Sequence, residues 1–254
     1  MHPVLFEIGA LKIGSYGVFL ALAFLAADIV FRKEIRRRGE SLVLANQVFL
    51  GALVGGLVGG KLLFILDHWG QFLADPVGIV FDTRGLSAYG GFVLAIGLCG
   101  WVIHRRGASV STVFDAAAPG LALAYGIARI GCQLAGDGCY GTSTALPWGM
   151  SYPEGIVPTH ESVHPTPIYE SLYSLALFAL LWRLRLPLQS TPFALFFLWL
   201  FLAGGGRFLV EFIRLNEPVA LGLTASQWLA LAGMGMAIIW VSGHSIGSSP
   251  QRRP

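Results

Sequence analysis

Long apolar runs separated by short polar segments dominate this chain. Seven such runs cover roughly residues 13–31, 43–66, 86–103, 112–135, 167–182, 193–212 and 221–241. A helix needs about 20 mostly apolar residues to cross the hydrocarbon core of a bilayer. The pattern therefore predicts an all-α polytopic membrane protein with about seven transmembrane helices, as one integral membrane domain over residues 1–254.

The segments between the runs predict the remaining elements. Residues 67–85, "DHWGQFLADPVGIVFDTRG", are amphipathic, aromatic and interrupted by proline, which suits an interfacial element. The longest hydrophilic loop covers residues 136–166, and residues 244–254 are expected to form a disordered tail.

Composition supports the membrane interpretation. Hydrophobic residues make up 55% of the chain and charged residues only 12%, whereas soluble domains carry about 25% charged residues. A soluble helical protein with a very apolar core is the alternative. The formal net charge of +3 does not suggest nucleic acid as a partner. The first residues have neither a basic region nor a small-residue cleavage site, so no removable signal peptide is expected.

Basic residues predict the orientation of the spans, because cytoplasmic loops are enriched in lysine and arginine. If the spans alternate, most basic residues fall on one side, namely Arg32, Lys33, Arg36, Arg37, Arg38, Arg105, Arg106, Arg183, Arg185, Arg252 and Arg253. That side should be the cytoplasm. The N-terminus and the 136–166 loop are then periplasmic, and the C-terminus is cytoplasmic.

Six cations do not follow this trend: Lys12, Lys61, Arg84, Arg129, Arg207 and Arg214. Cations near or within a span are functional candidates, because an unpaired charge in lipid costs several kcal/mol. Structural pairing with Glu170, Glu211 or Asp137 is the alternative.

Two spans carry arginine on a polar face. Arg207, Glu211 and Arg214 stand at i, i+4 and i+7, and Arg129 shares a face with Tyr125, Cys132 and Gln133. Because guanidinium groups bind phosphate through forked hydrogen bonds, this pair of arginines indicates a clamp for a lipid phosphate. A purely local ion pair between Arg207 and Glu211 is the alternative.

Two further segments offer polar groups at the outer ends of spans. "GLSAYGGF" places Tyr89 beside Gly90 and Gly91, and "HPTPIYESLY" carries His164, Tyr169 and Glu170. Tyr89 can equally be an interfacial aromatic residue, and His164 an ordinary surface histidine.

Glycines recur in two spans. Gly51, Gly55 and Gly59 are spaced for close helix packing. Gly204, Gly205 and Gly206 suggest a kink or a close ligand approach.

The three cysteines, Cys99, Cys132 and Cys139, lack the spacing of zinc ligands. We therefore expect no metal site. Cys132 and Cys139 can form a disulfide in an oxidising compartment or remain free thiols. No phosphate loop or serine-nucleophile motif is present, and no cofactor is expected.

Taken in order, several motifs resemble those of the bacterial prolipoprotein diacylglyceryl transferase family: "GSYGVFLALAF", "GLVGGKLLFIL", "ADPVGIV", "GLSAYGGF", "ARIGC" with "GDGCYG", "HPTPIYESLY", "GGGRFLVEFIR" and "ASQWLAL". They cover nearly the whole chain. The resemblance implies seven spans, an external N-terminus and an active site that faces the periplasm. It also implies transfer of diacylglyceryl from phosphatidylglycerol to the lipobox cysteine of a preprolipoprotein signal peptide, with release of glycerol phosphate, in the inner membrane.

The resemblance also implies roles for individual residues. Arg129 and Arg207 match the essential arginines of the family, and Tyr16, Gly141, Glu211 and the acid at Asp137 match other family positions. Lys61 stands where arginine is common. We assign catalytic roles to Arg129, Arg207, Tyr89 and Asp137. Substrate-binding roles are assigned to Tyr16, Lys61, Gly90, Gly91, Cys132, Gly141, His164, Tyr169, Glu170, Glu211 and Arg214. Phosphatidylglycerol, signal peptides and membrane lipids are the implied partners.

Two departures from the family pattern concern the acceptor chemistry. Tyr89 replaces the histidine of the usual "HGG", and Cys132 replaces an asparagine. A phenol ordinarily titrates near pH 10 and is a poor base at neutral pH. The alternatives are therefore a divergent paralogue that uses another acceptor, or a non-catalytic lipid-binding membrane protein.

Overall fold

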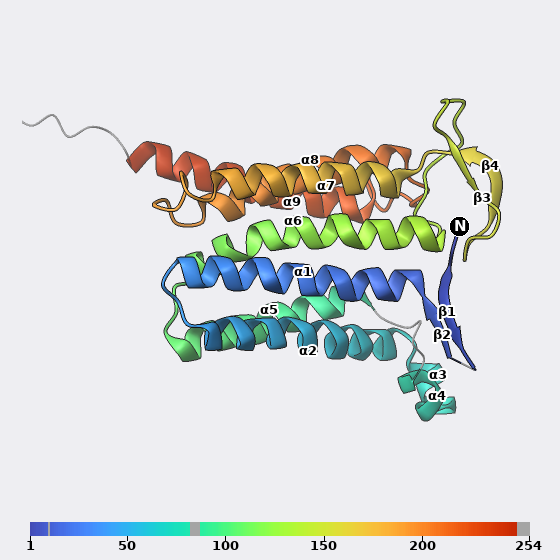
Figure 1. Cartoon of the computed structure of the whole chain (residues 1–254), viewed down its shortest axis with the longest axis horizontal. Helices are drawn as coiled ribbons and strands as arrows, with labels where there is room; N and C mark the ends of the chain where they lie inside the picture. The colour runs from blue at the N-terminus through green and yellow to red at the C-terminus, as the bar shows by residue number, and fades with distance from the viewer. Residues whose placement is uncertain (10, 82–86, 248–254) are drawn as a thin grey trace, which may run out of the picture. The chain divides into compact units, whose positions relative to one another are not determined.

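The computed structural model describes residues 1–9, 11–81 and 87–247. Its elements, in chain order, are β1 (Val4–Ile8), β2 (Leu11–Gly14), α1 (Ser15–Arg37), α2 (Leu42–Asp67), α3 (Trp69–Ala74), α4 (Pro76–Phe81), α5 (Ala88–Arg106), α6 (Val110–Ala135), β3 (Met150–Tyr152), β4 (Thr159–Val163), α7 (Thr166–Leu184), α8 (Ala194–Val210), the 3-10 helix η1 (Glu211–Ile213) and α9 (Ala225–Gly247) (Figure 1).

The helical, multi-pass architecture confirms the predicted fold class. Within the described residues, five helices are long and apolar enough to cross a membrane: α1, α2, α6, α8 together with η1, and α9. Helices α5 and α7 occupy the other two predicted spans but are not among these five, so the number seven stays a prediction. Helix α9 continues to Gly247, four residues into the predicted tail, and residues 248–254 lie outside the described part.

The chain divides into two compact units, one formed by residues 1–30 and 114 onward, the other by residues 31–113. The prediction of a single membrane domain over residues 1–254 is not tested by this division and stays a prediction.

In the unit of residues 31–113, α2 and α5 pack through glycines. A Cβ atom on Gly55 would lie 2.4 Å from the Ala95 Cα, and one on Gly59 would lie 2.3 Å from the Gly90 oxygen. Backbones can approach this closely only where side chains are absent. The predicted packing role is confirmed at Gly55 and Gly59, whereas a Cβ atom on Gly51 would lie at an ordinary 3.6 Å from α5.

The segment after α2 forms two short helices, α3 and α4. Several of their large apolar side chains are exposed, among them Trp69, Leu73 and Val77, whereas Ile79 is buried. Exposed apolar side chains on short helices are typical of an interfacial element, in keeping with the prediction for this segment. Arg84, one of the six candidate cations, lies outside the described residues.

In the other unit, an antiparallel hairpin of β1 and β2 precedes α1. Its start is tied to the helices that follow it, because the Ser15 amide donates to the Pro3 oxygen (2.9 Å) and the His2 amide to the Leu134 oxygen (3.0 Å). The sequence pattern did not predict this hairpin. Figure 1 shows β1 and β2 beside the C-terminal end of α6, on the same side of this unit as β3 and β4.

Helices α6, α7 and α8 enclose an apolar core formed by Ala118, Ala122, Leu177, Leu181 and Leu195. The buried carboxylate of Asp115 accepts hydrogen bonds from the Phe193 and Phe196 amides at 3.0 and 2.9 Å. These amides belong to the N-terminal end of α8, where backbone donors have no partner within the helix. Asp115 thereby fixes one end of α8, and Arg207 stands near the other.

Two of the three glycines before Arg207, Gly204 and Gly206, serve helix packing, whereas a Cβ atom on Gly205 would have nothing within 4 Å. A Cβ atom on Gly206 would lie 2.4 Å from the Tyr173 ring, and one on Gly204 would lie 3.1 Å from the Met234 side chain. Helix α8 runs unbroken through all three glycines. The close approach at Gly204 and Gly206 is made by α9 and α7, and a kink at this point stays a prediction.

Candidate functional site

Glu170 is the centre of a buried ionic cluster. It lies in the first turns of α7 and is 6% exposed. Its carboxylate lies 3.3 Å from Nε of Arg129, 2.9 Å from Arg207 and 3.2 Å from Arg214. Three guanidinium groups, from α6, α8 and the residue after η1, therefore meet one carboxylate.

Glu211 is a second, almost fully buried carboxylate in the same cluster. It lies 2.7 Å from Arg207 and 3.8 Å from Arg214. It also accepts hydrogen bonds from Thr224 (2.8 Å) and Asn216 (2.7 Å). The local ion pair between Arg207 and Glu211 that we considered is present, but it belongs to a larger network.

The charges of this cluster do not cancel. Three guanidinium groups face two carboxylates, which leaves one net positive charge. The arginine side chains are only 10–23% exposed, so water screens this charge poorly. An anion that arrives at the cluster would complete the pairing, and guanidinium groups suit phosphate oxygens particularly well.

Tyr125 connects Arg129 to Glu170. Its hydroxyl donates to Glu170 and accepts from Arg129 at 2.7 Å. The Arg129 guanidinium also lies 4.7 Å from the centre of the Tyr125 ring. Because Tyr125 stands one helical turn before Arg129 on α6, the helix itself produces this contact.

The loop of residues 136–166 holds Arg214 in place through its backbone. Gly141 bridges Arg214 in an antiparallel pair, and its amide donates to the His164 oxygen at 2.8 Å. A Cβ atom on Gly141 would lie 2.3 Å from the Ile213 oxygen, so no other residue fits there unless the chain shifts. The glycine at this position is therefore explained by backbone packing behind the arginine cluster.

His164 and Tyr169 form a second polar group near the cluster. His164 Nδ1 lies 3.4 Å from the Tyr169 hydroxyl, which accepts a hydrogen bond from the Trp148 indole at 2.8 Å. Trp148 brings the long loop to the start of α7.

Two tyrosines form the base of the same loop. Tyr152 stacks on Tyr140 at 4.9 Å and donates to Gln133 at 2.9 Å. Burial raises the pKa of Tyr152 to about 12, so it remains a neutral hydrogen-bond donor.

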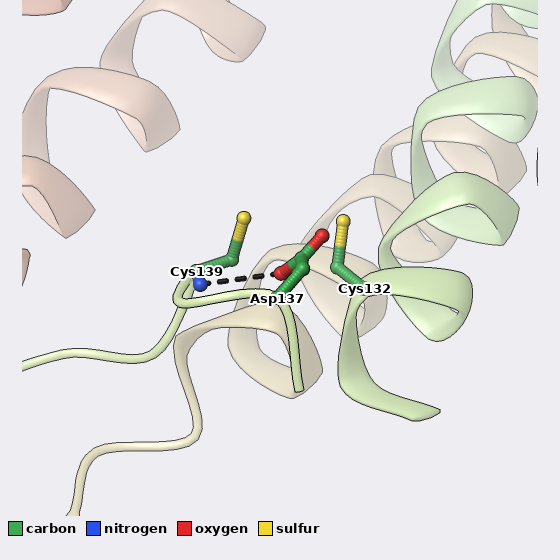
Figure 2. Close-up of side chains that lie close together, drawn as sticks. All are labelled: Cys132, Asp137 and Cys139. Carbon is green, nitrogen blue, oxygen red and sulfur yellow. Dashed lines mark hydrogen bonds between the residues drawn. The ribbon is translucent and has the colours of Figure 1, made fainter. Parts of the chain in front are cut away.

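Cys132, Asp137 and Cys139 converge where α6 ends. Their ligand atoms lie within 4.8 Å of one another, and all three cysteines of the chain are free thiols. Figure 2 shows the three side chains pointing toward the same side of the turn, with a hydrogen bond from the Cys139 amide to Asp137 (3.2 Å). One guanidinium nitrogen of Arg129 lies 3.8 Å from the Cys132 sulfur and 3.6 Å from the Cys139 sulfur.

The surroundings of Cys139 favour its thiolate. A hydrogen bond from the Cys132 thiol lowers the pKa of Cys139 to about 7, and the charge of Arg129 acts in the same direction. Burial and the Asp137 carboxylate oppose this shift. The arrangement stabilises an anion on sulfur, whereas a metal cation would have to bind beside the Arg129 guanidinium.

Four other predicted residues belong to the compact unit that does not carry the arginine cluster. Tyr89, Gly90, Gly91 and Lys61 belong to the unit of residues 31–113. Tyr89 is 55% exposed in the first turn of α5, and Lys61 lies over the Phe64 ring at 5.2 Å. The close approach at Gly90 and Gly91 is made by the α2 backbone. The catalytic role of Tyr89 and the substrate-binding roles of the other three residues stay predictions.

Tyr16 belongs to the same unit as the arginine cluster. It is half-exposed at the start of α1, and a Cβ atom on Gly131 would lie 3.3 Å from its Cα. Tyr16 therefore lies beside the segment of α6 that carries Arg129 and Cys132.

Comparison with known proteins assigns this architecture. The model of the prolipoprotein diacylglyceryl transferase family matches residues 3–242. The chain belongs to this family. Several relatives named as transferases are similar along most of their length. The phosphatidylglycerol–prolipoprotein diacylglyceryl transferase of Clostridium tetani is 35% identical over 91% of this chain and 93% of its own.

Two further transferases of the family are similar. The phosphatidylglycerol–prolipoprotein diacylglyceryl transferase 2 of Clostridium perfringens is 33% identical over 91% of both chains. That of Dehalococcoides mccartyi strain CBDB1 is 32% identical over 94% of this chain and 92% of its own. The resemblance deduced from the motifs is thereby confirmed.

Several members of the site were not predicted. The Ser226 hydroxyl accepts a hydrogen bond from Arg207 at 3.1 Å. The side chains of Thr224 and Asn216 donate hydrogen bonds to Glu211. These small polar residues carry no motif, and only their positions in the fold bring them to the cluster. Cys139 was considered only as a disulfide candidate. The turn through Gly136 and Gly138, both with positive φ, returns it to Cys132.

Proposed function

We propose that this chain transfers the diacylglyceryl group of phosphatidylglycerol to the lipobox cysteine of prolipoproteins and releases glycerol phosphate. The observation that carries the proposal is the buried arginine cluster at Glu170, with its one unpaired positive charge, in a chain of this family. We further propose that the reaction takes place at the periplasmic face of a bacterial inner membrane.

The arginines would act on the phosphate of the lipid. In the reaction, a bond forms between the acceptor sulfur and the glyceryl carbon, and the bond from that carbon to the phosphate oxygen breaks. The leaving glycerol phosphate keeps the bonding electron pair. Preorganised positive charge at this oxygen lowers the barrier, because the charge develops there in the transition state. Arg129, Arg207 and Arg214 supply that charge.

The acceptor must lose its proton, because the thiolate is the nucleophile. Glu170 is unsuited as the base, since taking up a proton would break its contacts with three guanidinium groups. His164, Asp137 and Tyr89 remain candidates, and we assign Tyr89 to the acceptor side of the reaction.

The direct test combines the purified protein in detergent with phosphatidylglycerol and a lipobox peptide. Mass spectrometry should show a peptide heavier by one diacylglyceryl group. The matched control is the same peptide with its cysteine replaced by serine, which should stay unmodified. A protein that binds phosphatidylglycerol but never modifies the cysteine peptide would contradict the proposal and favour the paralogue or lipid-binding alternative.

A further inference from the structure

The cysteines at the end of α6 are arranged for thiol chemistry that the transfer reaction does not use. Cys132 is 6% exposed and Cys139 is partly exposed, with their sulfur atoms within 4.8 Å. A disulfide requires about 2.05 Å between the sulfurs. Both side chains point to the same side of the turn (Figure 2), and closure requires them to rotate toward each other.

We propose that Cys132 and Cys139 form a redox-active dithiol that closes to a disulfide by exchange with an external disulfide. The partly exposed Cys139 sulfur attacks first, with the Arg129 guanidinium 3.6 Å away to stabilise its negative charge. One external thiol leaves, and Cys139 carries a mixed disulfide. The Cys132 thiol then loses its proton and attacks the Cys139 sulfur, which releases the second external thiol. Two protein thiols are oxidised, and one external disulfide is reduced to two thiols.

The fold holds Cys139 in position for this closure. Its amide donates to Asp137, and its carbonyl accepts from the Thr166 hydroxyl on α7. The turn before it is packed against the loop, because a Cβ atom on Gly136 would lie 2.7 Å from the Gly155 Cα. The backbone is thus anchored on both sides, which keeps the Cys139 sulfur close to that of Cys132.

Closure would change the charge at the arginine cluster. In the reduced form, a thiolate at Cys139 can offset the surplus positive charge through Arg129. Disulfide sulfurs are neutral, so oxidation leaves that charge available to an anion. The oxidised form should therefore bind anionic lipid more tightly than the reduced form.

A mass measurement on the full chain tests the dithiol without any substrate of the proposed transferase reaction. Cys99→Ser protein in detergent is reduced and then treated with oxidised glutathione. The expected product is lighter by about 2 Da and retains no glutathione, since two hydrogens are lost on closure. A non-reduced digest should contain a peptide linked between Cys132 and Cys139.

Two variants trap the separate steps. Cys132→Ala should accumulate a stable glutathione adduct on Cys139, because the resolving thiol is missing. Cys139→Ser should not close to a disulfide. The mass measurement on Cys99→Ser does not depend on whether Cys132→Ala and Cys139→Ser fold. That measurement therefore decides the proposal by itself. Thiols that stay free, or adducts that persist on the Cys99→Ser protein, would overturn the dithiol.

Zinc provides a further discriminating probe. The reduced protein is mixed with zinc chloride, passed through a desalting column and analysed for metal. We expect no retained zinc, because the Arg129 cation lies beside both sulfurs. One tightly held zinc ion per chain that blocks the thiols would overturn the proposal in favour of a metal centre.

Discussion

At the scale of single residues, the site depends on how charge is distributed among a few buried side chains. The Glu170 carboxylate forms ion pairs with three guanidinium groups, and the Glu211 carboxylate forms ion pairs with two of these three. Removing one arginine would leave two guanidinium groups facing two carboxylates. The cluster would then have no surplus positive charge to bind an anion. The arginines should therefore matter more for turnover than for folding.

Arg129→Lys and Arg207→Lys test this directly. Lysine keeps the charge but loses the planar fork that binds two oxygens. Each variant should lose about 100–1000-fold in transfer rate, the usual effect of removing one donor from a preorganised anion site. The rate is measured with phosphatidylglycerol and lipobox peptide, and Arg183→Lys, at an exposed position of α7, is the matched control. Near-normal turnover in both cluster variants would contradict a phosphate-binding role.

Tyr89 tests the acceptor side of the reaction. Tyr89→His should raise the transfer rate at neutral pH, because imidazole titrates near 6.5 and a phenol ordinarily near 10. Tyr89→Phe should be tolerated. The pH dependence of the rate is the measurement. If Tyr89→Phe abolished transfer while the protein stayed folded, Tyr89 itself would have to be the base.

The reactivity of the Cys139 thiol should depend on pH. Its pKa is lowered to about 7, chiefly by the Cys132 hydrogen bond, so its alkylation rate should reach half its maximum near that pH. Below that pH the thiol is protonated and slow to react. In Cys132→Ala the hydrogen bond is lost, and the midpoint should move up toward about 8.5, the value of an ordinary cysteine. Iodoacetamide kinetics on Cys99→Ser backgrounds measure both midpoints. An unchanged midpoint in Cys132→Ala would show that Cys132 does not stabilise the thiolate.

At the scale of elements, glycines set how closely helices pack. Adjacent glycines of α2 differ sharply in surroundings. A Cβ atom on Gly55 would lie 2.4 Å from the Ala95 Cα, whereas one on Gly56 would have nothing within 4 Å. The same helix therefore offers a contact position and a matched open position.

Gly55→Ala should lower the unfolding temperature, and Gly56→Ala should not. The first change forces α2 and α5 apart, at a cost of about 1–3 kcal/mol for an overpacked contact. The second adds only a methyl group in open space and should stabilise the helix slightly, because alanine is the better helix former. Thermal unfolding in detergent compares the two. Equal shifts in both variants would contradict glycine-mediated packing of α2 on α5.

At the scale of the whole molecule, the distribution of basic residues predicts which ends of the helices face the cytoplasm. The last turn of α1 and the residue after it carry Arg36, Arg37 and Arg38, whereas the loop of residues 136–166 reaches the arginine cluster through Gly141. If the positive-inside trend holds, that loop and the proposed active site face the periplasm.

Reporter fusions test this orientation. A reporter fused after Arg38 should be active only as a cytoplasmic marker, and one inserted near Glu154 only as a periplasmic marker. Each position is tested with both reporter types in separate fusions. A position at which neither reporter is active then indicates loss of expression, not a location. Reversed signals at the two sites would place the site on the cytoplasmic face and contradict the proposed topology.

The sequence alone determined the helical elements, because a helix that enters lipid needs a long apolar run whatever its neighbours are. It also predicted the packing glycines of α2, since their spacing of four residues places them on one helix face. The arginines were recognisable for the same local reason, as charges that lipid does not tolerate without a partner. Yet Gly204 and Gly206, in a run of similar composition, pack against α9 and α7, and their pattern did not distinguish such packing from a kink.

Only the tertiary structure decided which partners meet. That Arg129, Arg207 and Arg214 share Glu170 depends on three separate segments packing against the start of α7. The meeting of Cys132 and Cys139 depends on a turn with two glycines at positive φ, and on the Thr166 contact that anchors it. Such contacts join residues that are far apart in sequence, or residues that a turn of the chain brings back together. No local periodicity encodes either kind of contact. The N-terminal hairpin was missed for a related reason, since it is a short irregular ladder held by hydrogen bonds to α1 and α6.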